Sequence, residues 1–384
     1  MVGVVVFLCL AAARVSAING TGVGDRGDGA IERLLIQSLD LVGQNRLDDA
    51  WNSIQTLLTL RPDFRLANAI LGDLLMARAG GITRFGEGVV GHEKELGDLL
   101  SEAKVRLDNE KQPPESALPG ELLRIPARYD HVVMVDLSRS RLYIFRNWQS
   151  IPEKVSDYYI AIGKAGAGKE HQGDNRTPVG FYHVTGYLAS KTLPPFYGAG
   201  AFPLDYPNAW DRLHRRTGGG IWLHGSPADT YSRPPRASEG CVVLTNPDFK
   251  SLEHYLTVDN PVILAQHIEW LPPSEWWRRR ELMIQRVYQW RDDWLRFKGE
   301  GILRYYSSQY QSGRMDDAAW NRLLDGNVNL MDPGLMGYPG VDSMVVVTWG
   351  GWQTSGTGGR GVPMTQYWRR EEGSEWKIVF EPNG

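Results

Sequence analysis

A cysteine and a histidine near the middle of the chain are the residues best suited to do chemistry. Cys241 stands in the segment Ser238–Val242 (SEGCV), and His224 stands upstream in Ile221–Gly225 (IWLHG). The only other cysteine, Cys9, lies in an apolar N-terminal stretch that we expect to be removed, which leaves one thiol that cannot form an internal disulfide. A thiolate that attacks a carbonyl, with an imidazole that takes and returns the proton, is the minimal arrangement for acyl transfer.

The neighbouring residues are of types that could activate such a pair. Arg233 and Arg236 lie on the same loop as Cys241, and a nearby positive charge favours the ionised thiol. The carbonyl of Gly225 could accept a hydrogen bond from one ring nitrogen of His224 and fix its tautomer. Together these residues favour a catalytic interpretation of the segment.

Backbone groups next to the cysteine suggest how a developing negative charge could be stabilised. Gly240 lets the backbone approach a substrate closely, so the N–H groups of Gly240 and Cys241 are candidates for an oxyanion hole. Two other interpretations stay open on the residues alone. A cysteine among Val and Leu is usually a small buried side chain. His214, His224 and Cys241 could also bind zinc, although no HxxxH or CxxC spacing favours that site.

Composition and the N-terminus limit where the protein acts. The chain has 384 residues, 42% hydrophobic and 23% charged, which predicts two or three globular domains. Its net charge of -3 gives no strong field for nucleic acid. Residues 1–17 have the apolar core and small-residue end of a secretory signal, and no later stretch is apolar enough to span a membrane. We therefore expect an exported, periplasmic protein.

Residues 18–111 are expected to form a helical domain. Apolar residues recur at helical spacing in three segments between about residues 29 and 79, and a charged helix follows at 92–110. Asp48 is the expected cap of the second helix, and Pro62 is its expected end. The pattern fits a tetratricopeptide unit and a half or a plain helical hairpin equally well. Because such repeats need about three copies to stand alone, we expect packing on a neighbour or on a second copy in a homodimer.

Two further domains are expected beyond a linker at 112–116. Short apolar runs between Gly and Pro turns predict a β-rich domain over residues 124–268, with strands at 131–136, 141–145, 157–163, 181–185, 220–224, 241–244 and 261–264. Residues 274–384 are expected to form an α+β unit, with strands at 343–349, 363–369 and 376–380. Its amphipathic helix, 276–297, carries a stripe of Trp276, Met283, Val287, Trp290 and Trp294.

Two motifs in the β-rich domain resemble those of the L,D-transpeptidase catalytic domain, the YkuD family. That family carries a His-Gly and, after a short gap, Ser/Thr-x-Gly-Cys, which here are His224-Gly225 and Ser238-Glu239-Gly240-Cys241. An earlier family stretch appears as Gly173–Tyr182 (GDNRTPVGFY). The resemblance covers residues 130–266. It implies that Cys241 is the nucleophile, that His224 gives and takes the proton, and that Gly225 orients the histidine. Candidate substrate-binding residues are Arg233, Arg236, Arg176, Ser238 and Trp222.

The domain order resembles a cell-shape-determinant subgroup of that family. The subgroup joins a helical N-terminal domain, the transpeptidase fold and a C-terminal domain similar to nuclear transport factor 2, also called SnoaL-like. Some of its members are L,D-carboxypeptidases. One position departs from the family pattern, because most members carry a second histidine where this chain has Glu239.

The resemblance implies a periplasmic enzyme that acts on peptidoglycan stem peptides and needs no metal or organic cofactor. Cys241 is expected to attack the carbonyl of the L-centre of a diamino acid, release the terminal D-Ala and pass the acyl group to an amine, as an L,D-transpeptidase does. Transfer to water, as in an L,D-carboxypeptidase, is one alternative. A non-catalytic wall-binding scaffold with an inert Cys241 is another.

Overall fold

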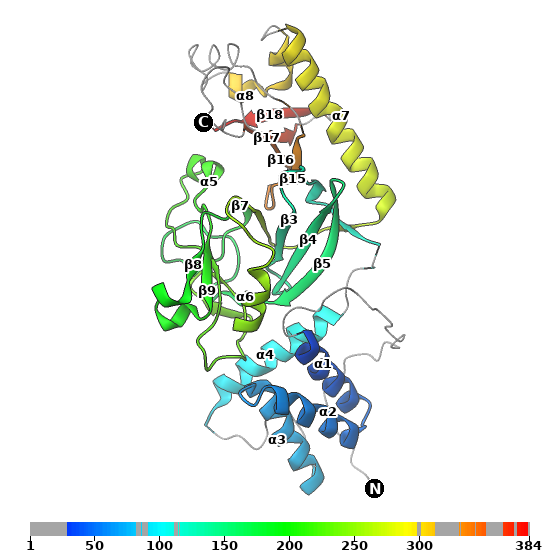
Figure 1. Cartoon of the computed structure of the whole chain (residues 1–384), viewed down its shortest axis with the longest axis vertical. Coiled ribbons are helices and arrows are strands. Elements are labelled where there is room, and N and C mark those ends of the chain that lie inside the picture. The colour runs from blue at the N-terminus through cyan, green and yellow to red at the C-terminus, as the bar shows by residue number, and fades with distance from the viewer. Residues whose placement is uncertain are drawn as a thin grey trace.

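The computed structural model describes residues 29–81, 86, 91–110, 114, 116–297, 301–311, 330, 332–341, 343–350, 364–371 and 375–382. The predicted signal at 1–17 and most of the predicted linker lie outside these residues. A helical unit, a β-rich central domain and an α+β unit follow one another along the longest axis of the molecule (Figure 1). This confirms the predicted multidomain fold class. Among the described helices, none combines the length and the apolar character that a membrane crossing requires.

The helical unit consists of α1 (Gly29–Gly43), α2 (Leu47–Leu60), α3 (Arg65–Ala79) and α4 (Glu93–Glu110). Their apolar faces close on a common core that includes Leu35, Ile54 and Leu57, all fully buried. The prediction that Asp48 caps α2 was wrong. The N-cap position is Arg46, and Asp48 lies within the first turn, where it pairs with Arg78.

The central domain is built on two sheets. The first has the strand order β5-β4-β3-β13-β7, with β3 (His131–Asp136), β4 (Arg141–Trp148), β5 (Ile151–Tyr159), β7 (Gly180–His183) and β13 (Pro261–Ala265). The second has the order β12-β10-β9-β8, with β8 (Leu188–Ala189), β9 (Gly200–Pro203), β10 (Trp222–His224) and β12 (Val242–Val243). Shorter elements are β6 (Ile162–Gly163), β11 (Arg236–Ser238), α5 (Ala209–Leu213), α6 (Asn246–Leu252), η1 (Ser190–Thr192) and η2 (Pro195–Tyr197).

Strand β3 shows why the sequences of the predicted strands are continuously apolar. Val133 and Val135 face the core shared with the second sheet, whereas Val132 and Met134 face the core shared with the C-terminal unit. Side chains alternate between the two faces of a strand, so a strand covered on both sides is apolar at every position. The first sheet is therefore the middle layer of the molecule.

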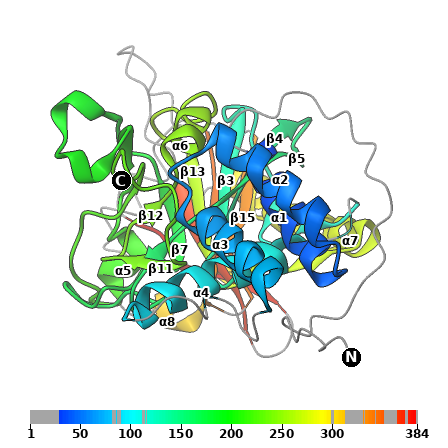
Figure 2. The ribbon, with the colours of Figure 1, turned by 90° about the horizontal axis from the view of Figure 1, so that it is seen from below.

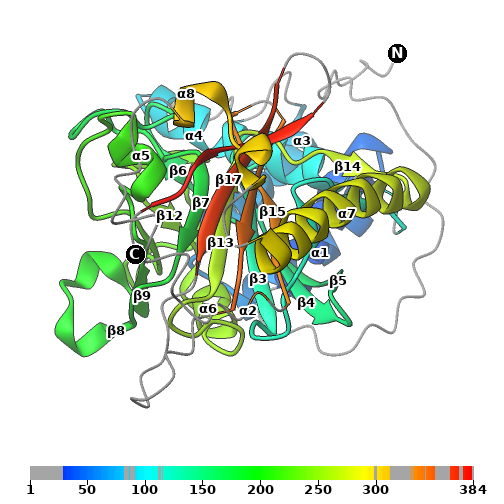
Figure 3. The same cartoon turned by 90° about the horizontal axis from the view of Figure 1, so that it is seen from above.

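The C-terminal unit has the sheet order β18-β17-β16-β15-β2, formed by β2 (Leu122–Arg124), β15 (Gly334–Gly337), β16 (Met344–Thr348), β17 (Thr365–Arg370) and β18 (Trp376–Phe380). Helix α7 (Pro273–Phe297) crosses the outer face of this sheet (Figure 3). Around it lie β1 (Leu118–Pro119), β14 (Trp270–Leu271), η3 (Ile302–Tyr305) and α8 (Ser308–Gln311).

Two features of this unit bear on the sequence predictions. The expected stripe on α7 is confirmed, because Trp276, Met283, Val287, Trp290 and Trp294 are its buried residues. Strand β2 precedes the central domain in the chain, yet it pairs with β15. The last sheet is thus not made of residues 274–384 alone. The likeness to nuclear transport factor 2 stays a prediction.

Candidate active site

Strand pairing brings Cys241 and His224 to neighbouring strands. β10 and β12 run parallel, with Leu223 opposite Val242 and His224 opposite Val243. Cys241 directly precedes β12, and its sulfur lies 3.3 Å from the carbonyl oxygen of Gly220, just before β10. Alternation along both strands places the side chains of Cys241 and His224 on one face of the sheet. The tertiary structure therefore joins the two residues that the sequence singled out.

The imidazole of His224 is held in one tautomer. Its side chain is 1% exposed, and Nδ1 lies 2.6 Å from the carbonyl oxygen of Gly225. A carbonyl can only accept, so Nδ1 carries the proton and Nε2 keeps a free lone pair. Burial lowers the pKa of His224 to about 4, the bond to Gly225 opposes this shift, and the charge of Arg233 adds to it. The ring is therefore a neutral proton acceptor at neutral pH.

Gly225 is required at its position by the lack of space. A Cβ atom there would lie 2.4 Å from Oδ1 of Asn246 and 2.7 Å from the backbone nitrogen of Ala199. The same Oδ1 accepts hydrogen bonds from the backbone N–H groups of Ala199 at 2.8 Å and Ser226 at 3.2 Å. Asn246 thus ties the residue after Gly225 to the segment before β9. Sequence reasoning missed it, and its one local signal was its place just before Pro247 at a helix start.

The thiol of Cys241 is half-buried and neutral in the resting structure. Burial raises the pKa of Cys241 to about 11, and the carboxylate of Glu239 adds to this shift. The backbone N–H of Trp222 and the charges of Lys169 and Arg233 act in the opposite direction. With the thiol and the imidazole both neutral, a thiolate at Cys241 would require transfer of its proton.

The turn before Cys241 is braced from inside the domain. Ser238 is 2% exposed, and its hydroxyl donates to the carbonyl of Cys241 at 2.6 Å while it accepts from the N–H of Gly240 at 3.1 Å. Gly240 has a φ of +131°, and a Cβ there would lie 2.8 Å from the carbonyl oxygen of Arg176. Ser238 therefore shapes the turn. The Gly240 N–H is engaged with the Ser238 hydroxyl, and the N–H of Cys241 stays a candidate oxyanion donor.

The candidate substrate-binding residues lie in different surroundings. Arg176 is exposed and donates to the carbonyl of Ala167 at 2.8 Å, whereas Arg236 is exposed on β11. Arg233 is half-buried and donates to the carbonyl of Ala237 at 3.2 Å. Among the described residues, its Nε is buried without a hydrogen-bond partner. Arg233 is the one of the three arginines whose charge contributes to the pKa values of both Cys241 and His224.

An aromatic cluster that the sequence reasoning missed covers the histidine. The ring centroids of Tyr197 and His224 are 5.0 Å apart, those of Phe196 and His224 are 5.8 Å apart, and those of Tyr197 and Trp222 are 4.7 Å apart. Burial raises the pKa of Tyr197, and the charges of Cys241 and Glu239 contribute. Tyr197 therefore lies against His224 and within electrostatic range of Cys241. Nothing in its local sequence other than the preceding prolines marked the segment.

The zinc interpretation finds no support in the geometry. Nδ1 of His214 lies 2.9 Å from the carbonyl of Trp210, and its ring packs on the Trp210 ring with centroids 4.4 Å apart. Over the part of the chain that the structure describes, no three His, Cys, Asp or Glu side chains come together as metal ligands. His214 belongs to the end of α5 and not to the pair at Cys241.

Comparison with known proteins agrees with this geometry. Residues 130–264 match the family model of the L,D-transpeptidase catalytic domain, YkuD. Bd1075 from Bdellovibrio bacteriovorus is 25% identical, with a TM-score of 0.58 over 69% of this chain and 97% of Bd1075. The helical cell shape determining protein Pgp2 from Campylobacter jejuni is 19% identical, with a TM-score of 0.55 over 74% of this chain and 99% of Pgp2. No curated protein sequence matches the chain. The chain thus contains an L,D-transpeptidase catalytic domain of the YkuD family, set in a multidomain fold like that of the cell-shape determinant Pgp2.

Proposed function

We propose that this protein is a peptidoglycan-modifying cysteine acyltransferase. It cleaves the bond between the L-centre of a diamino acid and the terminal D-Ala of stem tetrapeptides, and it passes the acyl group to an amine. The observation that carries the proposal is the placement of Cys241 and His224 on one face of adjacent parallel strands, with Nδ1 of His224 bound to the carbonyl of Gly225. The match to the L,D-transpeptidase family supports the substrate class.

Acylation follows from the protonation states in the site. Nε2 of His224 takes the proton of the Cys241 thiol as the sulfur bonds to the carbonyl carbon, and the carbonyl electron pair moves to the oxygen. The N–H of Cys241 donates to that oxygen. When the C=O bond re-forms, the C–N bond breaks, and the imidazolium gives its proton to the departing amine of D-Ala. Because His224 is buried with a pKa near 4, it returns this proton readily.

The second half reverses these steps with a new nucleophile. An acceptor amine attacks the thioester, His224 takes its proton, and the C–S bond breaks as the proton returns to the sulfur. Trp222 and Tyr197 stand beside the reacting groups and would contact the two peptides. The nucleophile that these side chains admit then decides the product.

An L,D-carboxypeptidase is the second candidate, favoured by the position of Glu239. Its side chain is 81% exposed, and its charge acts on the Cys241 thiol. A solvated carboxylate next to a thioester can accept a proton from an attacking water. Transfer to water would trim a tetrapeptide to a tripeptide without any other change in the mechanism.

Mass spectrometry of tetrapeptide muropeptides after incubation with the purified protein tests the proposal. Dimers indicate transfer to an amine, and tripeptides alone indicate transfer to water. We expect Cys241→Ala to abolish both products and the exposed-histidine variant His254→Gln to retain them. If neither product forms while a control enzyme turns over the same substrate, the acyltransfer proposal is wrong and the wall-binding scaffold takes its place.

The place of action and the assembly are also proposals. The apolar start of the chain, residues 1–17, supports export to the periplasm, where peptidoglycan lies. Fractionation of cells that produce the full chain tests this. The homodimer rests on the short helical unit alone, and the measured mass of the purified protein in solution tests it.

A further inference from the structure

The segment that links His224 to Cys241 reaches into the helical unit. Tyr231, in the middle of that segment, is 8% exposed and belongs to the apolar core of α1–α4. Its ring meets the ring of Phe64 edge-on, with centroids 4.6 Å apart, and the guanidinium of Arg61 lies 5.5 Å from its centroid. A residue of the catalytic domain is thus part of the core of another unit. Figure 2 shows how α1–α4 lie against the central domain.

The next residue of the segment completes a helix of that unit. Phe64, at the N-cap position of α3, makes no side-chain capping bond. The hydroxyl of Ser232 instead accepts a hydrogen bond from the backbone N–H of Leu66 at 3.0 Å. A capping bond of this kind satisfies one of the free N–H groups of a helix start. The catalytic segment therefore caps α3 from outside.

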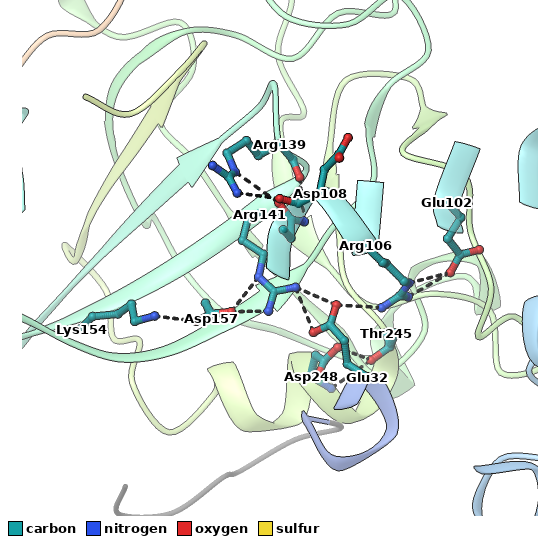
Figure 4. Close-up of polar contacts among 11 residues, drawn as sticks. Glu32, Glu102, Arg106, Asp108, Arg139, Arg141, Lys154, Asp157, Thr245 and Asp248 are labelled. Atoms are coloured by element: carbon teal, nitrogen blue, oxygen red, sulfur yellow. Dashed lines mark hydrogen bonds and ion pairs between the residues drawn. The ribbon is translucent and has the colours of Figure 1, made fainter. Parts of the chain in front are cut away.

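Helix α4 also contacts this segment, through Arg106 and Tyr159. The guanidinium of Arg106 lies 3.9 Å from the ring centroid of Tyr159, and the hydroxyl of Tyr159 donates to the carbonyl of Arg233 at 2.7 Å. Arg106 is in turn held by Glu102, at 3.0 Å, and by Glu32, at 3.2 Å. Figure 4 shows the bonds of Arg106 to Glu102 and Glu32, which continue from Glu32 to Arg141. The backbone of Arg233 is thus fixed by contacts that begin in the helical unit.

The segment that these contacts hold connects His224 to Cys241. Arg233 follows Tyr231 and Ser232 directly, and its charge contributes to the pKa values of both Cys241 and His224. The segment has Gly225 at one end and Ser238 at the other, and these residues orient His224 and brace Cys241. Because this segment is short, a displacement of its middle residues would also move Gly225 and Ser238.

We propose that the helical unit is a positioning element of the catalytic pair, with Tyr231 as the anchor that fixes the segment between His224 and Cys241. The proposal rests on the proposed function, since it concerns the same site. Tyr231 is a positioning residue, because it acts through the segment and touches neither reacting group. The repeat-like helices then have their packing neighbour within the same chain.

The test compares Tyr231→Ala with Ile54→Ala in the full chain. Ile54 is fully buried in the same helical core but lies on α2, so its loss weakens the unit without removing the anchor. Both variants are measured well below their unfolding temperatures. We expect kcat/KM on tetrapeptide muropeptides to fall on the order of 10²-fold in Tyr231→Ala, as misplacement of catalytic groups does, and to stay near wild type in Ile54→Ala.

A second readout does not depend on the muropeptide reaction. Loosening the segment uncovers the Cys241 thiol, so its alkylation by iodoacetamide at constant pH should speed up in Tyr231→Ala and not in Ile54→Ala. Tyr231→Phe keeps the ring against Phe64 and should restore both properties. If Tyr231→Ala does not fold, Ser232→Ala replaces it, with an expected loss of about threefold in kcat/KM from one hydrogen bond.

The outcomes separate the two proposals. Wild-type rates of both reactions in folded Tyr231→Ala, or equal losses in Ile54→Ala, overturn the positioning role and leave the acyltransfer proposal standing. A wild-type protein that forms no muropeptide product, combined with faster alkylation in Tyr231→Ala only, overturns the acyltransfer proposal and supports the positioning role. If Ser232→Ala reacts with muropeptides and with iodoacetamide at wild-type rates, that result counts against the positioning role of the anchored segment.

Discussion

The central domain is held from two sides by contacts of different kinds. On the C-terminal side, one apolar core joins its first sheet to the last sheet of the chain, and Met134, Met336 and Val346 are fully buried within it. On the N-terminal side, charged groups bridge the units in addition to the buried ring of Tyr231, with Arg141 of β4 bonded to Glu32 of α1 at 2.8 Å and also to Asp157 of β5 (Figure 4).

This difference separates stability from control of the site. We call the apolar core shared by the first and last sheets the C-terminal seam. Burial of apolar surface stabilises the folded state in proportion to the buried area, and it does not depend on the orientation of the groups in contact. A buried ionic cluster gains little net free energy, but its hydrogen bonds fix the orientation of the parts it joins. We infer that the C-terminal seam mainly stabilises the molecule and that the N-terminal contacts mainly set the geometry that reaches Cys241.

Breaking the ionic cluster should have the largest effect on stability. Arg141→Met leaves Glu32 and Asp157 buried without their shared partner, and loss of one member of such a cluster costs about 4 kcal/mol. We expect a lower free energy of unfolding in urea and faster hydrogen exchange in α1. The control, Arg146→Met, breaks a pair with Glu153 that is about half exposed and should cost less than about 1 kcal/mol. Equal losses in the two variants would contradict the assignment.

Opening the apolar seam should have a slightly smaller and differently distributed effect. Met336→Ala removes a fully buried side chain of β15 at a cost of about 3 kcal/mol. Because the core is shared, the first sheet and the last sheet should lose hydrogen-exchange protection together, whereas kcat/KM of the folded protein stays unchanged. A fall in kcat/KM as large as that expected for Tyr231→Ala would remove the distinction between the two sides.

The two carboxylates of the N-terminal contacts should respond to pH in opposite directions. Burial raises the pKa of Glu102 to about 7 from 4.5, so its contribution to stability is full below pH 4.5 and is lost as the pH rises through about 7. Although burial opposes it, the charges of Arg141 and Arg106 lower the pKa of Glu32. The contribution of Glu32 is full above pH 4.5 and is lost as the pH falls through its folded pKa.

Urea unfolding of Glu102→Gln between pH 5 and pH 8 checks this sign. The wild type should lose about 1–3 kcal/mol from Glu102 as the pH rises, and the variant should lack that decline. Glu32→Gln is the matched comparison, and it should be less stable than the wild type at pH 8. If the stability of Glu102→Gln falls with rising pH as steeply as that of the wild type, the carboxyl of Glu102 does not titrate in this range.

The smallest effect is expected at the exposed side of the site. The carboxylate of Glu239 raises the pKa of Cys241, so Glu239→Gln should increase the fraction of thiolate. Because this side chain is largely solvated, we expect the alkylation rate at pH 8 to rise only about twofold. Glu153→Gln, which removes an exposed carboxylate elsewhere, serves as the control. A slower rate in Glu239→Gln would mean that Glu239 does not act on the sulfur through its charge.

Much of the fold could be predicted from local pattern. The buried stripe of α7 and the apolar strands β3 and β13 were predicted because period and composition report directly which faces are covered. The predicted cap at Asp48 was wrong, because α2 begins at Leu47 with Arg46 in the N-cap position, two residues before Asp48. Strand β15 was missed, since the short run Gly334–Gly337 has no strand pattern of its own and is paired on both sides.

The sequence by itself singled out the cysteine and the histidine of the proposed reaction, because the His-Gly and Ser-x-Gly-Cys motifs are local and are visible without the fold. Only the tertiary structure decided that Asn246 holds the residues around Gly225, that Tyr197 covers the imidazole and that Tyr231 belongs to the core of another unit. The physical reason is that these three act through contacts between segments far apart in the chain. Their residue types alone, an amide and two tyrosines, are compatible with many other positions.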